Sequence, residues 1–346
     1  MGAKRLLRRL DSLRQIPYPQ IQPMMDRIPR PIKPAALRPH NSVRVLSLAS
    51  PVKPELLRKG CDEITRLGYV AEADAATVLA RESYFAGSAR CRRAALERAL
   101  AETETRAIFC SRGGYGSNYL LDELNIATDH AKILLGSSDI TSLQIYLWQK
   151  FGWVTFYGPM VASNFHHGAS AAHGYDRESL LRALTETERG WELDLEGESL
   201  IAGDAEGVLL GGCLTLIEAS LGTPWELDTF DEEKGGSILV LEDRGMKPYQ
   251  VDRALMHLRQ AGKFEGLAGV VLGDFPECAA EGGETVRDVA RRILEPMAVP
   301  LVWGAPIGHT ERAALTVPLG IRARLSVPAG ADAAAKLQIL EPACTR

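Results

Sequence analysis

The chain has 346 residues, of which 46% are hydrophobic and 24% are charged, and its formal net charge at pH 7 is -4. This length allows two domains with a substantial buried core, and the composition is ordinary for a soluble globular protein. The slight negative charge gives no reason to expect nucleic acid or an anionic membrane as a partner, and no apolar run reaches the roughly 18 residues that span a bilayer.

The first 42 residues have a composition of their own. The start is basic, with no apolar segment after it that would make a secretory signal, and residues 17–39 are rich in proline and arginine. This pattern predicts an extended or disordered N-terminal extension over residues 1–42. A targeting or partner-binding segment is the alternative interpretation.

Residues 43–165 alternate between strand-like and helical patterns. The apolar, β-branched run that begins at Val43 predicts a buried first strand. Further strands are expected at 69–71, 107–110 and 133–135, and helices at 53–67, at 90–102, from about 118 and at 139–150. Short connections between alternating strands and helices favour a parallel sheet flanked by helices. This part is therefore expected to be an α/β domain.

The pattern changes after residue 165. Residues 166–200 are polar and are predicted to form a connector. From 201 to 346, short apolar segments are separated by only two clear helical patterns, at about 249–261 and 284–294. The second half is therefore expected to be a β-rich α+β domain with a barrel-like or mixed sheet.

The six cysteines are scattered, at Cys61, Cys91, Cys110, Cys213, Cys278 and Cys344. Because no two of them form a C-x-x-C pair, they favour neither a zinc site nor a disulfide framework. Reduced thiols in a cytoplasmic protein are the simplest interpretation.

A serine-containing turn, GSSDIT, separates a strand-like segment from the helix that begins at Asp139. A serine there would project into the cleft above the carboxyl ends of the strands, where open α/β sheets place their sites. The helix N-terminus would supply N–H groups for an oxyanion. Ser138 is therefore a candidate nucleophile, although the G-x-S-x-G spelling is absent. The alternative is that Ser137, Ser138 or Asp139 only caps the helix.

A glycine turn, RGGYG, follows the strand expected at 107–110. Glycines allow main-chain amides to approach a ligand closely, so one amide could form half of an oxyanion hole. Arg112 could bind a substrate carboxylate through its planar guanidinium. A structural turn or a phosphate-binding loop are the alternatives.

Two further residues suit acid–base chemistry. Glu242 ends an apolar strand-like segment, ILVLED, where a carboxylate could orient a histidine; an exposed carboxylate paired with Arg244 or Lys247 is the alternative. His309 lies in a Gly/Pro loop, and its pKa near neutrality suits a general base; a structural loop histidine is the alternative. The adjacent His166 and His167 are interpreted as structural or substrate-rim residues.

Six blocks occur in a fixed order within residues 43–340: RGGYG, GSSDIT, TFYGPM, LLGGCLTLIEASLGTP, ILVLED, and PIGHT with PLG. Together they resemble the L,D-carboxypeptidase family, serine peptidases that include murein tetrapeptide carboxypeptidases and microcin C immunity peptidases. The resemblance implies a flavodoxin-like N-terminal domain, a β-rich C-terminal domain, a site between them and a homodimer.

The resemblance also implies roles for individual residues. The family's nucleophile falls on Ser138, its acid on Glu242 and its base on His309. Its oxyanion donors fall on the main chain of Asp139 and of a glycine in the RGGYG turn, expected to be Gly114. No metal and no cofactor is expected.

Other residues of the glycine turn are expected to contact the substrate, namely Arg112, Gly113 and Tyr115. Two positions depart from the family pattern. Ser137 replaces the aromatic residue that precedes the nucleophile, which removes a bulky wall. Cys213 replaces a common asparagine after the glycine pair, so a polar contact there is lost.

The expected activity is release of the terminal D-alanine from murein tetrapeptide during cell-wall recycling in the cytoplasm, through an acyl-enzyme. The expected partner is this small peptide, without nucleic acid or membrane. One alternative is hydrolysis of aminoacyl- or peptidyl-nucleotide conjugates, against which the lack of an aromatic-rich insertion for stacking a nucleobase argues. The other is a non-catalytic module that binds a small ligand.

Overall fold

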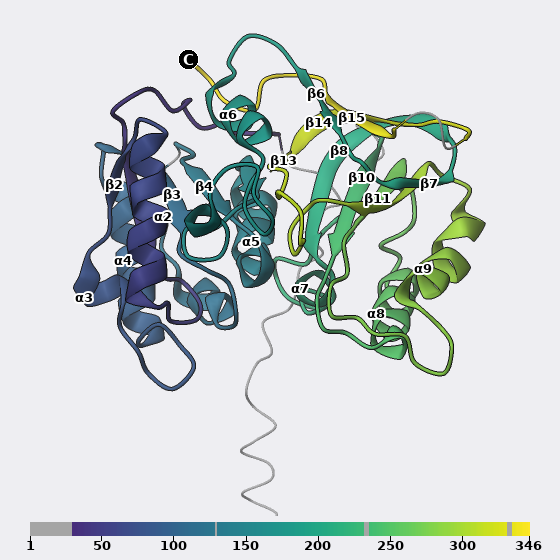
Figure 1. Cartoon of the computed structure of the whole chain (residues 1–346), viewed down its shortest axis with the longest axis horizontal. Coiled ribbons are helices and arrows are strands. Elements are labelled where there is room, and N and C mark those ends of the chain that lie inside the picture. Colours follow the sequence, from purple (N-terminus) through teal and green to yellow (C-terminus); the bar gives the residue numbers. More distant parts are fainter. Residues whose placement is uncertain (1–29, 129, 232–234, 331–333) are drawn as a thin grey trace, which may run out of the picture.

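The computed structural model describes residues 30–128, 130–231, 235–330 and 334–346, and Figure 1 shows its two sheets side by side. Residues 1–29 of the predicted extension lie outside this part. Residues 30–41 are fixed by main-chain bonds: Ile32 donates to Gly152 O at 2.7 Å, and Ala36 to Thr345 O at 2.9 Å. Among the helices of the described residues, none combines the length and apolar character needed to cross a bilayer.

The first sheet has the strand order of a flavodoxin-like domain. Five parallel strands lie in the order 2-1-3-4-5: β1 (Ser42–Leu46), β2 (Val70–Glu72), β3 (Thr105–Cys110), β4 (Ile133–Gly136) and β5 (Thr155–Tyr157). The helices between them are α2 (Pro54–Arg66), α3 (Ala75–Val78), α4 (Ala89–Ala101) and α5 (Thr141–Phe151). The segment expected to be helical from about 118 is a 3-10 helix, η1 (Ser117–Glu123). The predicted α/β class is confirmed.

The helix α5 lies between the two sheets (Figure 1) and contacts elements of both. Every residue from Thr141 to Gln149 is buried, because the second domain covers the face that would otherwise meet solvent. Among its buried polar residues, Gln144 donates through Nε2 to Gly136 O at 3.2 Å and to Phe156 O at 2.9 Å. Because α5 follows β4 closely and lies at the boundary between the domains, the turn between β4 and α5 lies at this boundary as well.

The second sheet is mixed. Four parallel strands form its centre: β8 (Gly203–Cys213), β10 (Gly235–Glu242), β11 (Gly269–Gly273) and β12 (Leu301–Ala305). Antiparallel strands flank them: β14 (Ile321–Val327), β15 (Lys336–Ile339) and β6 (Trp191–Asp194) on one side and β7 (Glu198–Ile201) on the other. The short β9 (Phe230–Asp231) pairs with β10. The helices of this half are α7 (Leu214–Glu218), α8 (Pro248–Gln260) and α9 (Val286–Leu294).

The two edges of this second sheet lie close together. β6 and β7 stand at opposite ends of the strand order, yet only residues 195–197 separate them in the chain. So short a connection spans at most about 14 Å. The sheet must therefore curl until its edges nearly meet, which agrees with the predicted barrel-like, β-rich domain.

Three strands cross the expected domain boundaries. The stretch 166–200, predicted as a connector, contains α6 (Arg177–Thr185) as well as β6 and β7 of the second sheet. In the opposite direction, β13 (Val317–Leu319) leaves the second half and pairs antiparallel with β5 at the edge of the first sheet. Its central Pro318 suits such an edge position. The two halves are thus interlocked through their sheets.

Candidate active site

Ser138 occupies a strained turn between β4 and α5. Its φ is +60°, in the left-handed region that residues other than glycine seldom adopt. The 3-10 turn η2 (Ser138–Ile140) leads directly into α5, and the N-cap residues of the two, Ser137 and Ile140, make no side-chain cap bond. A strained serine between a strand and a helix is the geometry of a nucleophile elbow.

The side chain of Asp139 fastens this turn to the segment that follows the glycine turn. Its Oδ2 accepts a bond from the main-chain N–H of Ser117 at 2.7 Å, and Ser117 Oγ donates to Asp139 O at 2.5 Å. Burial raises the pKa of the Asp139 carboxyl, and the bonds from Ser117 oppose that shift. The aspartate thus holds two loops together, a role that sequence reasoning did not assign to it.

The glycine turn lies directly against Ser138. A Cβ on Gly113 would stand 2.9 Å from Ser138 Oγ and 3.2 Å from the amide nitrogen of Asp139. Gly114 has a φ of +106°, and a Cβ there would overlap Ser50, whose Oγ accepts a bond from Tyr115 N at 3.1 Å. Only glycines fit both positions, and they bring the main chain of this turn to Ser138.

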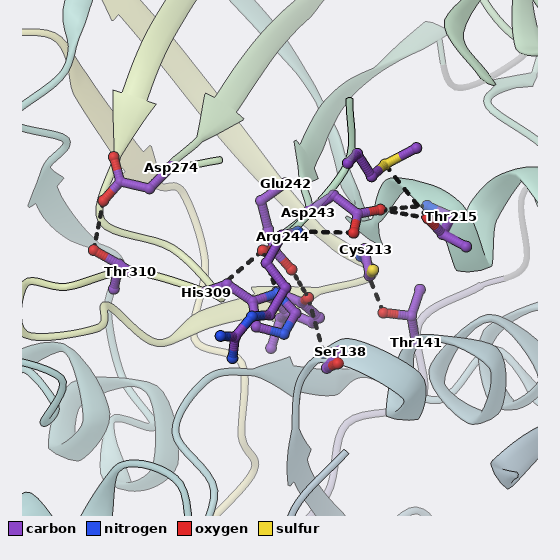
Figure 2. Close-up of polar contacts among 12 residues, drawn as sticks. Ser138, Thr141, Cys213, Thr215, Glu242, Asp243, Arg244, Asp274, His309 and Thr310 are labelled. Carbon is purple, nitrogen blue, oxygen red and sulfur yellow. Dashed lines mark hydrogen bonds and ion pairs between the residues drawn. The ribbon is translucent and has the colours of Figure 1, made fainter. Parts of the chain in front are cut away.

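Glu242 and His309 form a tight pair on the other domain. Glu242 ends β10 and is fully buried. His309 donates its main-chain N–H at 2.9 Å and its ring Nδ1–H at 2.8 Å to Glu242 Oε2 (Figure 2). Since a carboxylate can only accept, this bond places the ring proton on Nδ1 and leaves Nε2 free to take a proton.

Two opposing effects set the pKa of His309. Burial lowers the pKa, while the charge of Glu242 and its hydrogen bond raise it, and the net result is a pKa above the ordinary 6.5. Asp243 adds to the upward shift and Arg244 opposes it. The imidazolium form is therefore stabilised, as a general base requires once it has taken a proton.

The loop that carries His309 is held to a second strand end. Asp274, which follows β11, accepts a bond from Thr310 Oγ1 at 2.5 Å (Figure 2) and two from Arg312 Nη2 at 3.0 and 3.1 Å. These bonds fix the part of the loop that directly follows the histidine. Asp274 was missed from the sequence, although a carboxylate directly after the apolar strand GVVLG was an available signal.

Neighbouring polar residues complete this part of the site. Asp243 Oδ2 accepts bonds from Thr215 N at 2.8 Å and Thr215 Oγ1 at 2.6 Å.

Cys213, one of the two departures from the family pattern, donates its main-chain N–H to Thr141 Oγ1 at 3.1 Å. Burial, with Asp243 and Glu242 nearby, raises the pKa of the Cys213 thiol well above its ordinary value. This thiol stays protonated and is a poor nucleophile.

Both domains line one open cavity of about 420 Å³. Of the residues predicted for the site, Ser138, His309, Arg112, Gly113 and Gly114 line it. Glu242 and the side chain of Asp139 are buried behind its walls. No hydrogen bond joins Ser138 Oγ to the His309 ring in the described structure; such bonds often tighten only when substrate binds.

Tyr115 lies outside this lining. Its ring is 43% exposed and packs against Tyr84 and Tyr119, with ring centroids 6.1 and 6.0 Å away. Its expected contact with the substrate stays a prediction. His173 does line the cavity although its sequence context was uninformative. The rings of His166 and His167 contact each other in a tilted arrangement, with their centroids 3.9 Å apart.

The fold and the cavity together define a two-domain α/β protein with a serine, a histidine and a glutamate gathered at the domain boundary, an arrangement that serine hydrolases use. Family models for the N- and C-terminal domains of LD-carboxypeptidases match residues 43–158 and 206–325. The chain belongs to the LD-carboxypeptidase family, as its sequence blocks predicted.

Individual relatives agree with this assignment. A Bacillus subtilis protein named probable murein peptide carboxypeptidase is 32% identical over 300 residues, which cover 85% of this chain and 91% of the relative. The crystal structure of muramoyltetrapeptide carboxypeptidase from Oxalobacter formigenes matches 87% of this chain and 99% of its own, with a TM-score of 0.73 and 26% identity. The structure of the microcin C7 self-immunity protein matches 91% of this chain and 100% of its own. The TM-score of 0.78 shows a shared fold, and at 21% identity the likeness shows the fold alone.

Proposed function

We propose that the protein is a serine-type L,D-carboxypeptidase in which Ser138, His309 and Glu242 form the catalytic triad. The observation that carries the proposal is the bond from His309 Nδ1 to the buried Glu242, facing the strained Ser138 across one cavity. This pair leaves Nε2 of the histidine as the atom that takes the serine proton.

The reaction then proceeds through an acyl-enzyme. Ser138 Oγ attacks the amide carbonyl while His309 accepts the hydroxyl proton, and Glu242 stabilises the resulting imidazolium. The oxyanion lies between the main-chain amides of Asp139 and Gly114, and removing one such donor costs about 10²–10³ in rate. His309 then protonates the departing amine, and water hydrolyses the acyl-enzyme.

The substrate we propose is murein tetrapeptide, cleaved between the L-centre of its diamino acid and the terminal D-alanine. The names of the Bacillus subtilis and Oxalobacter formigenes relatives support this class of substrate. Arg112 suits the terminal carboxylate because it lines the cavity and forms no ion pair with a carboxylate among the described residues. A cavity of about 420 Å³ has room for the end of a peptide.

The same reasoning extends to the setting of the reaction. All six cysteines are free thiols, which is typical of a reducing compartment, so we place the enzyme in the cytoplasm, acting on a free peptide without a membrane or nucleic-acid partner. We also propose the homodimer that the family resemblance implies.

The nearest alternative keeps the hydrolase and changes the substrate to an aminoacyl- or peptidyl-nucleotide conjugate. The fold shared with the microcin C7 self-immunity protein favours it. No phenylalanine, tyrosine or tryptophan of the described chain lines the cavity, however, so a nucleobase would find only the imidazoles of His173 and His309 to stack on.

One experiment separates these candidates. The purified protein is incubated with murein tetrapeptide or with an aspartyl-adenylate analogue, and products are identified by mass spectrometry. We expect loss of one alanine from the peptide, little hydrolysis of the analogue, and no turnover of either by Ser138→Ala. Preferential hydrolysis of the analogue would contradict the substrate; undiminished turnover by Ser138→Ala would contradict the mechanism. A protein that hydrolyses neither and that no serine-directed probe labels would be a binding module.

A further inference from the structure

Tyr157 connects the nucleophile to the triad acid. It is the last residue of β5, in the first domain, and its side chain is fully buried. Its hydroxyl accepts a bond from the main-chain N–H of Ser138 at 3.0 Å and donates one to Glu242 Oε1. One hydroxyl thus contacts both halves of the proposed triad.

The chemistry of the three groups fixes the direction of both bonds. An amide N–H can only donate and a carboxylate can only accept, so the single hydroxyl proton must point to Glu242. Burial raises the pKa of Tyr157 well above its ordinary value, and Glu242 raises it further, so this proton is retained at any pH where the enzyme would work.

The bond from Ser138 also decides which amides can hold the oxyanion. In chymotrypsin-type enzymes the nucleophile's own N–H is one of the donors. Here the N–H of Ser138 is directed to Tyr157, so the hole must be made from the amide of Asp139 and from the glycine turn. The tyrosine therefore restrains the serine backbone in the φ of +60° that the elbow needs.

The two oxygens of the Glu242 carboxylate contact different domains. Oε1 faces Tyr157 of the first domain, while Oε2 holds His309 of the second. With donors on both oxygens the orientation of the buried carboxylate is fixed, and so is the imidazole that is bonded to it. The base and the nucleophile belong to different domains, and this hydroxyl bonds both to the main chain of Ser138 and to the carboxylate that holds His309.

We infer that Tyr157 is a positioning residue that holds the Glu242–His309 pair of one domain in register with Ser138 of the other. This inference rests on the proposed serine mechanism. It gives the tyrosine no contact with substrate and no part in proton transfer. Its removal should therefore slow the chemical step without weakening substrate binding.

The test compares two buried tyrosines. Tyr157→Phe removes only the hydroxyl and keeps the ring in its place. We expect kcat for D-alanine release to fall about ten- to a hundredfold, as for loss of a hydrogen bond to a charged group, while KM stays within about twofold. Phosphonylation of Ser138 by a serine-directed phosphonate probe, in which Oγ attacks phosphorus and displaces the leaving group, should slow by a similar factor.

Tyr175→Phe is the matched control. Tyr175 is equally buried, and its hydroxyl also donates to a glutamate, Glu63 Oε1 at 2.7 Å, away from the cavity. Both variants lose one buried bond to a carboxylate, so both should show a lower melting temperature, but Tyr175→Phe should keep wild-type kcat. A wild-type kcat in Tyr157→Phe, or an equal loss of kcat in both variants, would overturn the inference.

Two further measurements keep the outcome decisive. If Tyr157→Phe does not fold, site-specific 4-fluorophenylalanine at 157 fills the space of the hydroxyl but cannot donate to Glu242; kcat should fall there and not with the same replacement at 175, and equal kcat values overturn the inference. Ser138→Ala is assayed in parallel. Turnover by that variant would refute the proposed serine mechanism itself. A wild-type kcat in Tyr157→Phe, combined with an inactive Ser138→Ala, would refute only the role of the tyrosine.

Discussion

Gly308 passes so close to Glu242 that a methyl group on its Cα would overlap the carboxyl group. Its φ of +71° also lies in the region that glycine tolerates best. The carboxyl group of the proposed acid, Glu242, therefore leaves room only for glycine at the position before the proposed base, His309. Close contact between main chain and carboxylate is what allows His309 to bond Glu242 with both its amide and its ring.

The first prediction follows from this contact. Gly308→Ala should displace the carboxylate or the loop and lower kcat/KM by about a hundredfold or more, with a lower melting temperature. Gly222→Ala is the control, because its φ is +75° and no atom lies within 4 Å of the added Cβ. It carries the same backbone strain without the overlap, so it should be destabilised yet keep its activity. Equal activities in the two variants would show that the contact is unimportant.

The strain at Ser138 should be measurable as stability. A side chain in the left-handed region costs roughly 1–2 kcal/mol, which glycine avoids. Glycine, however, loses more conformational freedom on folding, and this loss cancels part of its advantage. We expect Ser138→Gly to be about 1 kcal/mol more stable than Ser138→Ala in urea unfolding, with neither variant active. Ser170 has a φ of +58° outside the site, and its Gly and Ala variants should show the same order with full activity. A less stable Ser138→Gly would contradict the elbow strain.

The rate should depend on pH through His309. The histidine must be neutral to accept the serine proton, and its pKa is raised above 6.5, so kcat/KM should fall as pH decreases through a midpoint above that value. Glu242→Gln removes the attraction and leaves the opposing effect of burial, so the residual activity should have its midpoint at lower pH. Glu63→Gln, which also loses a tyrosine-bonded carboxylate, should leave the midpoint unchanged. If the midpoint is the same in Glu242→Gln, a group other than His309 sets the pH dependence of the rate.

Asp274 should matter through the loop it anchors. Asp274→Asn weakens the bonds to Thr310 and Arg312, and we expect kcat to fall about tenfold, with a stability loss of about 1–3 kcal/mol. Asp252→Asn breaks another aspartate–arginine pair, with Arg292 on the surface between α8 and α9, where such pairs contribute little. Its activity should be that of the wild type. Equal kcat values for both variants would show that the loop needs no such anchor.

The sequence predicted the fold class because local patterns determine it. The alternation of strands and helices in 43–165 and the short apolar strands after 201 reappear in the structure within a few residues. Candidate site residues could also be placed, since Ser138 and Glu242 stand at strand ends, where parallel sheets place functional groups. Their catalytic roles remain predictions for the experiments above.

Other features depend on packing between distant segments and leave no periodic signal. β13 is a three-residue strand with a central proline, and nothing in its pattern indicates that it joins the first sheet. The joined edges β6 and β7 lie in a polar stretch that reads as a connector. Tyr157 lies within a quoted sequence block, yet its two bonds appear only when β5 and β10 are brought together.

The late arrival of β13 has a consequence for synthesis of the protein. The strand β5 ends at residue 157 and its partner β13 begins at residue 317, so a ribosome adding about 5–20 residues per second needs roughly ten to thirty seconds to supply it. During that time the nascent first domain exposes an unpaired strand edge, which invites pairing with other chains. We expect the N-terminal half expressed alone to aggregate, and the nascent chain to be a chaperone client until its last strands emerge.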